Sequence, residues 1–133
     1  MFYRKIAFSV LLFCHVSVVI ANEDVVTCPS IAEIKDERFQ AWLPLYKDGE
    51  ELASQEDVEK FKKHVMSFET AIWSGDYLES AHCFYRGEDA IVNKIIFGQD
   101  SWNPVTSQYW YWERPARIAK CNSSVQQDCR FIK

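Results

Sequence analysis

The fold is decided by residues 68–86, which read FETAIWSGDYLESAHCFYR. Apolar and polar side chains alternate along 68–73 and again along 78–86, a period of two that is typical of β-strands. The triplet Ser74-Gly75-Asp76 lies between them and has the composition of a tight turn. This stretch therefore predicts an antiparallel hairpin in the middle of the chain.

A helix is expected directly before the hairpin, over about residues 55–66. Ser54 followed by Asp57 has the spacing of a helix N-cap with an acid in the first turn. Val58 and Phe61 then begin an apolar face at helical spacing, with charged side chains off that face. The pattern indicates one amphipathic helix that packs on the sheet.

Further segments are expected to extend the sheet. Residues 39–46 alternate with a period of two, and Pro44 confines that strand to an edge because proline lacks an N–H group. Residues 90–97 are rich in Ile and Val, and residues 108–120 contain another strand, broken by Pro115. The predicted fold class is α+β, with one main helix packed on an antiparallel sheet of about four to five strands and stapled by disulfides.

The start of the chain has the organisation of an export signal. Arg4 and Lys5 precede an apolar stretch over residues 6–20, and Ala21 ends a cleavage site with small residues. A membrane-spanning helix needs roughly 20 apolar residues, so cleavage is favoured over an uncleaved anchor, which stays the alternative. We expect residues 1–21 to be a signal peptide and residues 22–133 to form a single α+β domain.

Charge and composition exclude several classes of protein. After residue 21 the chain carries all 19 acidic residues and 13 of the 15 basic ones, which gives a formal net charge of −6. Such a domain is poorly suited to the phosphates of nucleic acids or to anionic lipid headgroups. A hydrophobic content of 48% and an aromatic content of 15% exclude a disordered chain. We expect no nucleic-acid partner, and membrane association only through a partner or an uncleaved signal.

Four cysteines follow the signal, namely Cys28, Cys83, Cys121 and Cys129. An even number of cysteines in a short exported domain predicts disulfide bonds. Three pairings are open, and we favour Cys28 with Cys83 and Cys121 with Cys129. The spacings of 55, 38 and 8 residues match no zinc-binding pattern, so no metal site is expected.

No catalytic motif is present in the sequence. His82 and Cys83 are adjacent on a predicted strand, so their side chains face opposite sides of the sheet and cannot share a proton. We therefore expect no enzymatic activity, no catalytic residue and no cofactor. An enzyme built around His82, or an inhibitor of a host enzyme, is the least favoured hypothesis.

The most unusual stretch is aromatic. On a strand, Tyr109 and Tyr111 would face one side and Trp110 and Trp112 the other, with Trp102 shortly before them. Exposed rings suit sugars or the anchor pockets of protein interfaces, whereas buried rings would help to fill the core of a small domain. Both interpretations stay open. The candidate binding surface consists of Trp102, Tyr109, Trp110, Tyr111 and Trp112.

The order of these features resembles a known family. CPS at 28–30 follows the signal, F-x-x-A-x-W spans 68–73, CFY occupies 83–85, and CN…CRF closes the chain over 121–131. This pattern resembles the EirA-like family of small exported proteins, found in intracellular bacterial pathogens that use a Dot/Icm type IV secretion machine. The likeness covers nearly all of residues 28–131.

The resemblance implies a periplasmic, non-enzymatic accessory protein that supports type IV secretion, intracellular replication and thereby virulence. It would act through protein–protein interaction with a component of the envelope secretion complex, in the periplasm and with inner-membrane association as an option. The resemblance offers no catalytic residue to transfer. The alternative is a glycan- or peptidoglycan-binding module that uses an exposed aromatic patch, and a homo-oligomer is compatible with either function.

Overall fold

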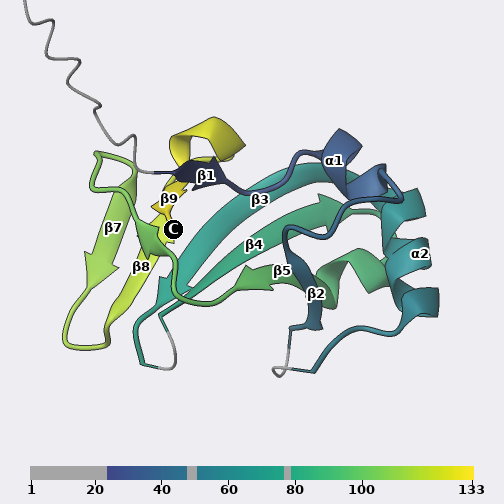
Figure 1. Ribbon diagram of the computed structural model, residues 1–133, viewed down its shortest axis with the longest axis horizontal. Helices are drawn as coiled ribbons and strands as arrows, with labels where there is room; N and C mark the ends of the chain where they lie inside the picture. The colour runs from purple at the N-terminus through teal and green to yellow at the C-terminus, as the bar shows by residue number, and fades with distance from the viewer. Residues whose placement is uncertain (1–23, 48–50, 77–78) are drawn as a thin grey trace, which may run out of the picture.

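The computed structural model describes residues 24–47, 51–76 and 79–133 (Figure 1). The expected signal peptide over residues 1–21 lies outside this part of the chain. Within it, nine β-strands form two antiparallel sheets, accompanied by two α-helices and two short 3-10 helices.

The elements follow one another along the chain as β1 (Val25–Thr27), α1 (Ile31–Lys35), β2 (Leu43–Tyr46), α2 (Gln55–His64), β3 (Val65–Ser74), β4 (Ser80–Gly87), η1 (Ala90–Asn93), β5 (Ile95–Gln99), β6 (Asn103–Pro104), β7 (Trp110–Glu113), β8 (Ile118–Cys121), η2 (Gln126–Asp128) and β9 (Arg130–Ile132).

The predicted hairpin is confirmed and forms the middle of the larger sheet. The order of its six strands is β2-β5-β4-β3-β8-β7, and the smaller sheet has the order β1-β9-β6. Strands β3 and β4 pair in antiparallel register, with Phe68 opposite Tyr85 and Trp73 opposite Ala81. Strand β2, which contains Pro44, lies at an edge as predicted.

Helix α2 has clear local causes for its start and its end. The Ser54 hydroxyl accepts a hydrogen bond of 3.2 Å from the Asp57 N–H, which caps the first turn. The helix ends at His64, two residues before the predicted end, because β3 begins at Val65. A Cβ atom on Gly87 would lie against the His64 carbonyl oxygen, so a glycine is needed where the helix end and β4 meet.

The predicted α+β class is wrong, because the described part of the chain is mostly β. Residues 108–120 form a hairpin of two strands, β7 and β8, rather than one strand. Short strands near the two chain ends, together with β6, also form the second sheet. Strands of two or three residues are too short to show a period of two in the sequence, which is why this sheet was not predicted.

The predicted strand over residues 90–97 is only half correct. Its first part is the 3-10 helix η1, and only the second part belongs to β5. The Asp89 carboxylate accepts a hydrogen bond of 2.9 Å from the Ile91 N–H, which favours a helical turn over an extended chain. Apolar composition alone cannot distinguish these two conformations.

An aromatic core joins the layers of the molecule. Phe61 of α2 is fully buried, and its ring centroid lies 5.5 Å from that of Phe97 on β5. In the smaller sheet, Phe131 lies between Trp42 and Trp110, with ring centroids 6.0 and 5.1 Å apart. These edge-to-face contacts hold the helix and the smaller sheet against the same face of the larger sheet.

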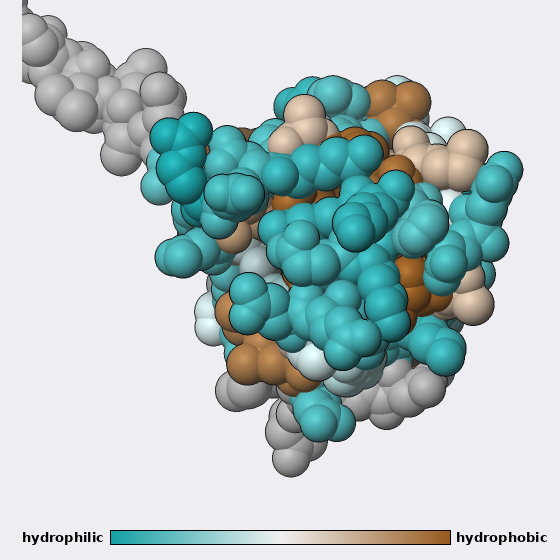
Figure 2. Space-filling model, turned by 90° about the vertical axis from the view of Figure 1, so that its right-hand side faces the viewer, coloured by the Kyte–Doolittle hydropathy of each residue, from teal (hydrophilic) through white to brown (hydrophobic). Residues whose placement is uncertain are grey.

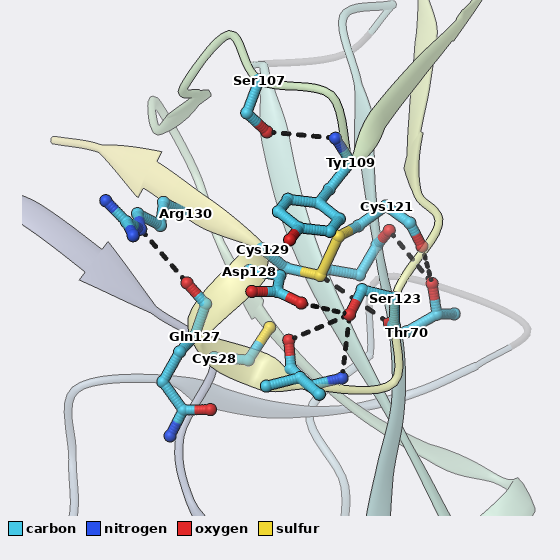
Figure 3. The surroundings of a disulfide bond; sticks show 12 residues. Cys28, Thr70, Ser107, Tyr109, Cys121, Ser123, Gln127, Asp128, Cys129 and Arg130 are labelled. Carbon is cyan, nitrogen blue, oxygen red and sulfur yellow. Dashed lines mark hydrogen bonds between the residues drawn. A yellow bond between two sulfur atoms is a disulfide. The ribbon is translucent and has the colours of Figure 1, made fainter.

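The four cysteines form two disulfide bonds, as predicted. Cys28 is joined to Cys83 and Cys121 to Cys129, the pairing favoured among the three. The first bond ties the segment before α1 to β4. The second connects β8 of the larger sheet to the residue that precedes β9 of the smaller one (Figure 3).

Candidate functional site

The strongest candidate site is a pocket at the β7 end of the larger sheet. It has a volume of about 500 Å³, and we call it the aromatic edge pocket. Its lining combines two indole rings and a proline with charged side chains: Trp73, Trp112, Glu113, Arg114, Pro115 and Arg117. Apolar walls with a few polar groups are typical of binding sites.

The two indoles of the pocket meet because a small residue separates them. Trp73 on β3 is paired with Ala119 on β8, and Ala119 is paired in turn with Trp112 on β7. The three side chains therefore form one row across the sheet, and the ring centroids of the two tryptophans lie 5.4 Å apart over the alanine. Trp73 is buried, whereas Trp112 ends the row and remains 37% exposed.

Charged groups line the turn side of the pocket. The Arg117 guanidinium lies 3.9 Å from the Glu79 carboxylate, and the two side chains are 60% and 49% exposed, so this ion pair is weak. No ion pair joins Arg114 to another described residue. A Cβ atom on Gly75 would lie 2.6 Å from the Trp73 ring and 3.1 Å from the guanidinium carbon of Arg117, so this glycine allows their close approach.

The main chain of β7 is open on its outer side. The Asn122 N–H donates a hydrogen bond of 2.6 Å to the Tyr109 carbonyl, which identifies these two residues as a hydrogen-bonded pair of the β7–β8 ladder. Pairs in an antiparallel ladder alternate between bonded and non-bonded. The N–H and C=O groups of Trp112 therefore point away from β8, and no described strand lies on that side.

The opposite edge of the same sheet is covered. The Tyr46 N–H donates to the Glu51 carbonyl at 2.9 Å, and the Ala53 N–H donates to the Pro44 carbonyl at 2.9 Å. Leu52 forms a β-bridge with Leu45 in this segment. The two edges of the larger sheet thus differ: β2 is capped by its own chain, whereas β7 is available.

The remaining aromatic residues of the candidate surface do not join the pocket. Trp110 is buried against Phe131 in the core. The Trp102 ring packs edge-on against Trp42 at 4.8 Å, with the Lys133 ammonium 5.2 Å from its centroid. The structure therefore separates the three tryptophans expected to form one patch.

The two tyrosines of the stretch also differ from each other. Tyr109 is half-buried near the Cys121–Cys129 bond, and its N–H donates a hydrogen bond of 3.3 Å to the Ser107 hydroxyl (Figure 3). Tyr111 lies on the face of β7 opposite to that of Trp110 and Trp112 and is 65% exposed. Of the five predicted surface residues, only Trp112 lines the aromatic edge pocket.

Sequence analysis missed most residues of this pocket. Trp73 lies on a strand of the predicted hairpin, and Arg114, Pro115 and Arg117 lie in the segment 108–120, where a strand broken by Pro115 was expected. Only the register of β3, β8 and β7 brings them together. Arg114, Pro115 and Arg117 follow the four aromatic residues within five positions, and this is the one signal that could have identified the pocket.

The residues considered for catalysis have other environments. Cys83 is bonded to Cys28, so it carries no free thiol. His82 is half-buried on β4, between Ile72 of β3 and Gly98 of β5. His64 is exposed at the end of α2, with Nε2 3.9 Å from the Asp89 carboxylate. Cys83 and His82 are neighbours on β4 whose side chains face opposite sides of the sheet, and His64 lies apart from them at the end of α2.

A larger pocket of about 610 Å³ lies beside α2, but its character is different. Its charged lining residues include Lys62 and Glu59, which already pair at 3.6 Å. Figure 2 shows that the face of the molecule bearing α2 is mainly hydrophilic. This pocket has the character of a solvated helix surface, whereas the aromatic edge pocket offers apolar area to a ligand.

No known protein family, curated protein or solved structure matches this chain. Within residues 24–47, 51–76 and 79–133, none of the helices is both long and apolar enough to cross a membrane. The same residues contain no group of three or more His, Cys, Asp or Glu side chains placed to hold a metal ion.

Proposed function

We propose that this protein is a periplasmic, non-enzymatic accessory protein that supports type IV secretion and intracellular replication by binding a protein of the envelope secretion complex. The observation that carries the interaction role is the aromatic edge pocket beside an uncovered strand. Tryptophan and arginine are the side chains most enriched in the energetic centres of protein interfaces, and both line this pocket.

Three further observations support the location and the role. The two disulfide bonds are suited to an oxidising compartment such as the periplasm. The resemblance of residues 28–131 to the EirA-like family supplies the link to the secretion machine. The acidic net charge favours a protein partner over nucleic acid or anionic lipid.

Genetic complementation tests this function. Deletion of the gene in the bacterium that encodes it should abolish effector translocation, and the wild-type gene should restore it. The Trp112→Ala variant should fail to restore translocation, whereas Met66→Ala, an exposed apolar residue on β3 away from the pocket, should restore it. Both variants are checked for equal amounts in the periplasmic fraction.

Three outcomes would each contradict one part of the proposal. Normal translocation in the deletion strain would remove the secretion role, and recovery of the protein with four free thiols from the cytosol would remove the periplasmic location. Equal complementation by Trp112→Ala and Met66→Ala would show that the pocket is not the interaction site.

A second candidate function is glycan binding, favoured by the exposed Trp112 ring beside Arg114 and Arg117. An indole face packs well on a sugar ring, and guanidinium groups pair with the carboxylates of peptidoglycan fragments. Titration with soluble peptidoglycan fragments should then change the tryptophan fluorescence, and Trp112→Phe should reduce the change. A flat titration with wild-type protein would dismiss this function.

A further inference from the structure

We propose that β7 receives an extended segment of the partner protein as an additional strand, with an apolar side chain of that segment in the aromatic edge pocket and an acidic side chain beside the arginines. This inference rests on the proposed function, because it specifies how the partner binds. Addition of a strand to a sheet edge is a recurrent mode of peptide recognition, in which the main chain gives affinity and alternate side chains give specificity.

The main chain of β7 provides the first part of the argument. Tyr109 and Asn122 form a hydrogen-bonded pair, and bonded and non-bonded pairs alternate along the β7–β8 ladder. Trp112 and Ala119 therefore form a non-bonded pair, and the N–H and C=O groups of Trp112 point outward. The Trp110 N–H already donates to the Ser107 carbonyl at 3.4 Å, which leaves the Trp110 carbonyl as a further outward acceptor. An incoming strand therefore finds two acceptors and one donor in the register of a normal antiparallel ladder.

The row of side chains across the sheet provides the second part. Trp73, Ala119 and Trp112 occupy one row on the core-facing side of strands β3, β8 and β7. A residue added opposite Trp112 extends this row, and its side chain lies against the exposed part of the indole. A large apolar side chain at this position continues the core, since the pocket next to it is lined by Trp73, Trp112 and Pro115.

Charge selects the neighbouring residue of the incoming strand. Side chains two residues apart on a strand face the same side. Arg117 directly precedes β8 and lies two positions from Ala119, toward the turn between β7 and β8, and it is opposite Gly75. Arg114 directly follows β7 and lies two positions after Trp112, toward the same turn. In an antiparallel segment, an acidic residue two positions before the apolar residue reaches these guanidinium groups.

The alternation gives a partner motif of the form acid–any–apolar in an extended segment. The two arginines of the aromatic edge pocket lie on a domain whose net charge is −6. An acidic segment is therefore attracted to the arginines, whereas the rest of the surface repels the segment. A second copy of this chain is a poorer occupant. Its own β7 has the apolar side chains Trp110 and Trp112 on the face that would meet the pocket, but no acidic side chain on that face.

Two synthetic peptides of equal composition test the mode of binding. The first places glutamate and phenylalanine on either side of one threonine within a run of threonines, so that both side chains face the pocket. The second makes the same two residues adjacent, so that they face opposite sides of the strand. Both are titrated into the full mature protein and followed by NMR of the backbone amides and by amide hydrogen exchange.

The first peptide should slow exchange of the Trp112 amide by about tenfold or more, because this N–H gains a hydrogen bond. The Tyr111 and Glu113 amides, which already face β8, should keep their exchange rates. The second peptide should bind more weakly and give no such protection. In Arg117→Glu protein, whose tryptophan row is intact, the first peptide should lose affinity, and replacement of its glutamate by lysine should restore binding.

The other outcomes overturn the inference. Absence of Trp112 protection at peptide concentrations up to about 1 mM would exclude strand addition. Shifts at Trp112 and Arg117 without slower exchange would indicate side-chain docking alone, and Trp112 protection that rises with protein concentration in the absence of peptide would make a second copy the occupant. If the peptide does not bind as a strand but Trp112→Ala still fails to restore translocation, the proposed function stands and only the mode of binding is wrong. If translocation is normal in the deletion strain, the proposed function is wrong whatever the peptide does.

Discussion

Tyr85 is a buried residue whose polar group has a defined partner in the fold. Its ring is buried among the aromatic side chains of the core, and its hydroxyl donates a hydrogen bond of 2.6 Å to the Pro29 carbonyl. Burial raises the pKa of Tyr85 far above the ordinary value of 10.0, because the phenolate would lose its hydration. This hydrogen bond and the Cys28–Cys83 bond hold the same N-terminal segment against β4.

Replacement of Tyr85 by Phe should therefore lower the free energy of unfolding at neutral pH by about 1–3 kcal/mol, the cost of leaving a buried acceptor unpaired. Above pH 10 the unfolded chain releases the phenolic proton and the folded protein keeps it. The contribution of Tyr85 is thus fully present below pH 10 and is lost as pH rises, by roughly 1.4 kcal/mol per pH unit for a single group. Urea unfolding of both proteins at pH 8 and pH 11 measures this.

The difference between wild type and Tyr85→Phe should shrink between these two pH values. Tyr111→Phe, a substitution at an exposed position, serves as the control and should leave the free energy of unfolding nearly unchanged. A difference that stays constant with pH would show that Tyr85 is not held neutral by the fold.

Among the elements, α2 depends on a small network at its start. Ser54 caps the Asp57 N–H at 3.2 Å, and the Tyr46 hydroxyl donates a hydrogen bond of 2.6 Å to the Asp57 carboxylate. The Ser54 N–H in turn donates to the Tyr46 hydroxyl at 3.0 Å. This network fixes the helix relative to β2, whose outer edge the preceding segment covers.

Replacement of Ser54 by Ala should lower the free energy of unfolding by about 1 kcal/mol, the usual cost of losing a helix N-cap. Chemical denaturation followed by circular dichroism measures the change. The adjacent substitution Gln55→Ala, at an exposed first-turn position, is the matched control and should change the free energy by less than about 0.5 kcal/mol. Equal effects of the two substitutions would mean that the cap is not what begins this helix.

On the scale of the whole molecule, two disulfide bonds close loops of very different length. Cys28–Cys83 spans 55 residues and Cys121–Cys129 spans 8. The entropy of the unfolded chain is restricted more by the longer loop, which corresponds to about 4 kcal/mol against about 2.5 kcal/mol for the shorter. The longer bond should therefore contribute more to stability.

Two paired substitutions test this order. Changing both Cys28 and Cys83 to Ser should lower the melting temperature more than changing both Cys121 and Cys129 to Ser, as measured by differential scanning calorimetry. Thiol labelling of each variant should find the other bond intact. A larger loss from the shorter bond would show that strain or packing at the second disulfide, rather than loop length, governs its contribution.

The elements with a long, regular pattern were predictable. The hairpin of β3 and β4, the capped helix and the edge position of the Pro44 strand follow from local chemistry, since alternation, an N-cap and a missing N–H act within a few residues. The fold class was predicted incorrectly, because β1, β6 and β9 have three residues or fewer and pair only with segments far away in the chain. Their stability comes from tertiary contacts that no local pattern reports.

The amino-acid sequence by itself determined the even number of cysteines after residue 21, the acidic net charge, the central hairpin and the aromatic composition of residues 109–112. Only the tertiary structure decided that Trp110 is core, that Trp102 packs on Trp42, and that Trp112 meets Trp73 over Ala119 beside two arginines. The physical reason is that strand register and edge position depend on pairing between distant segments. Register and edge position in turn determine which side of each aromatic ring is covered.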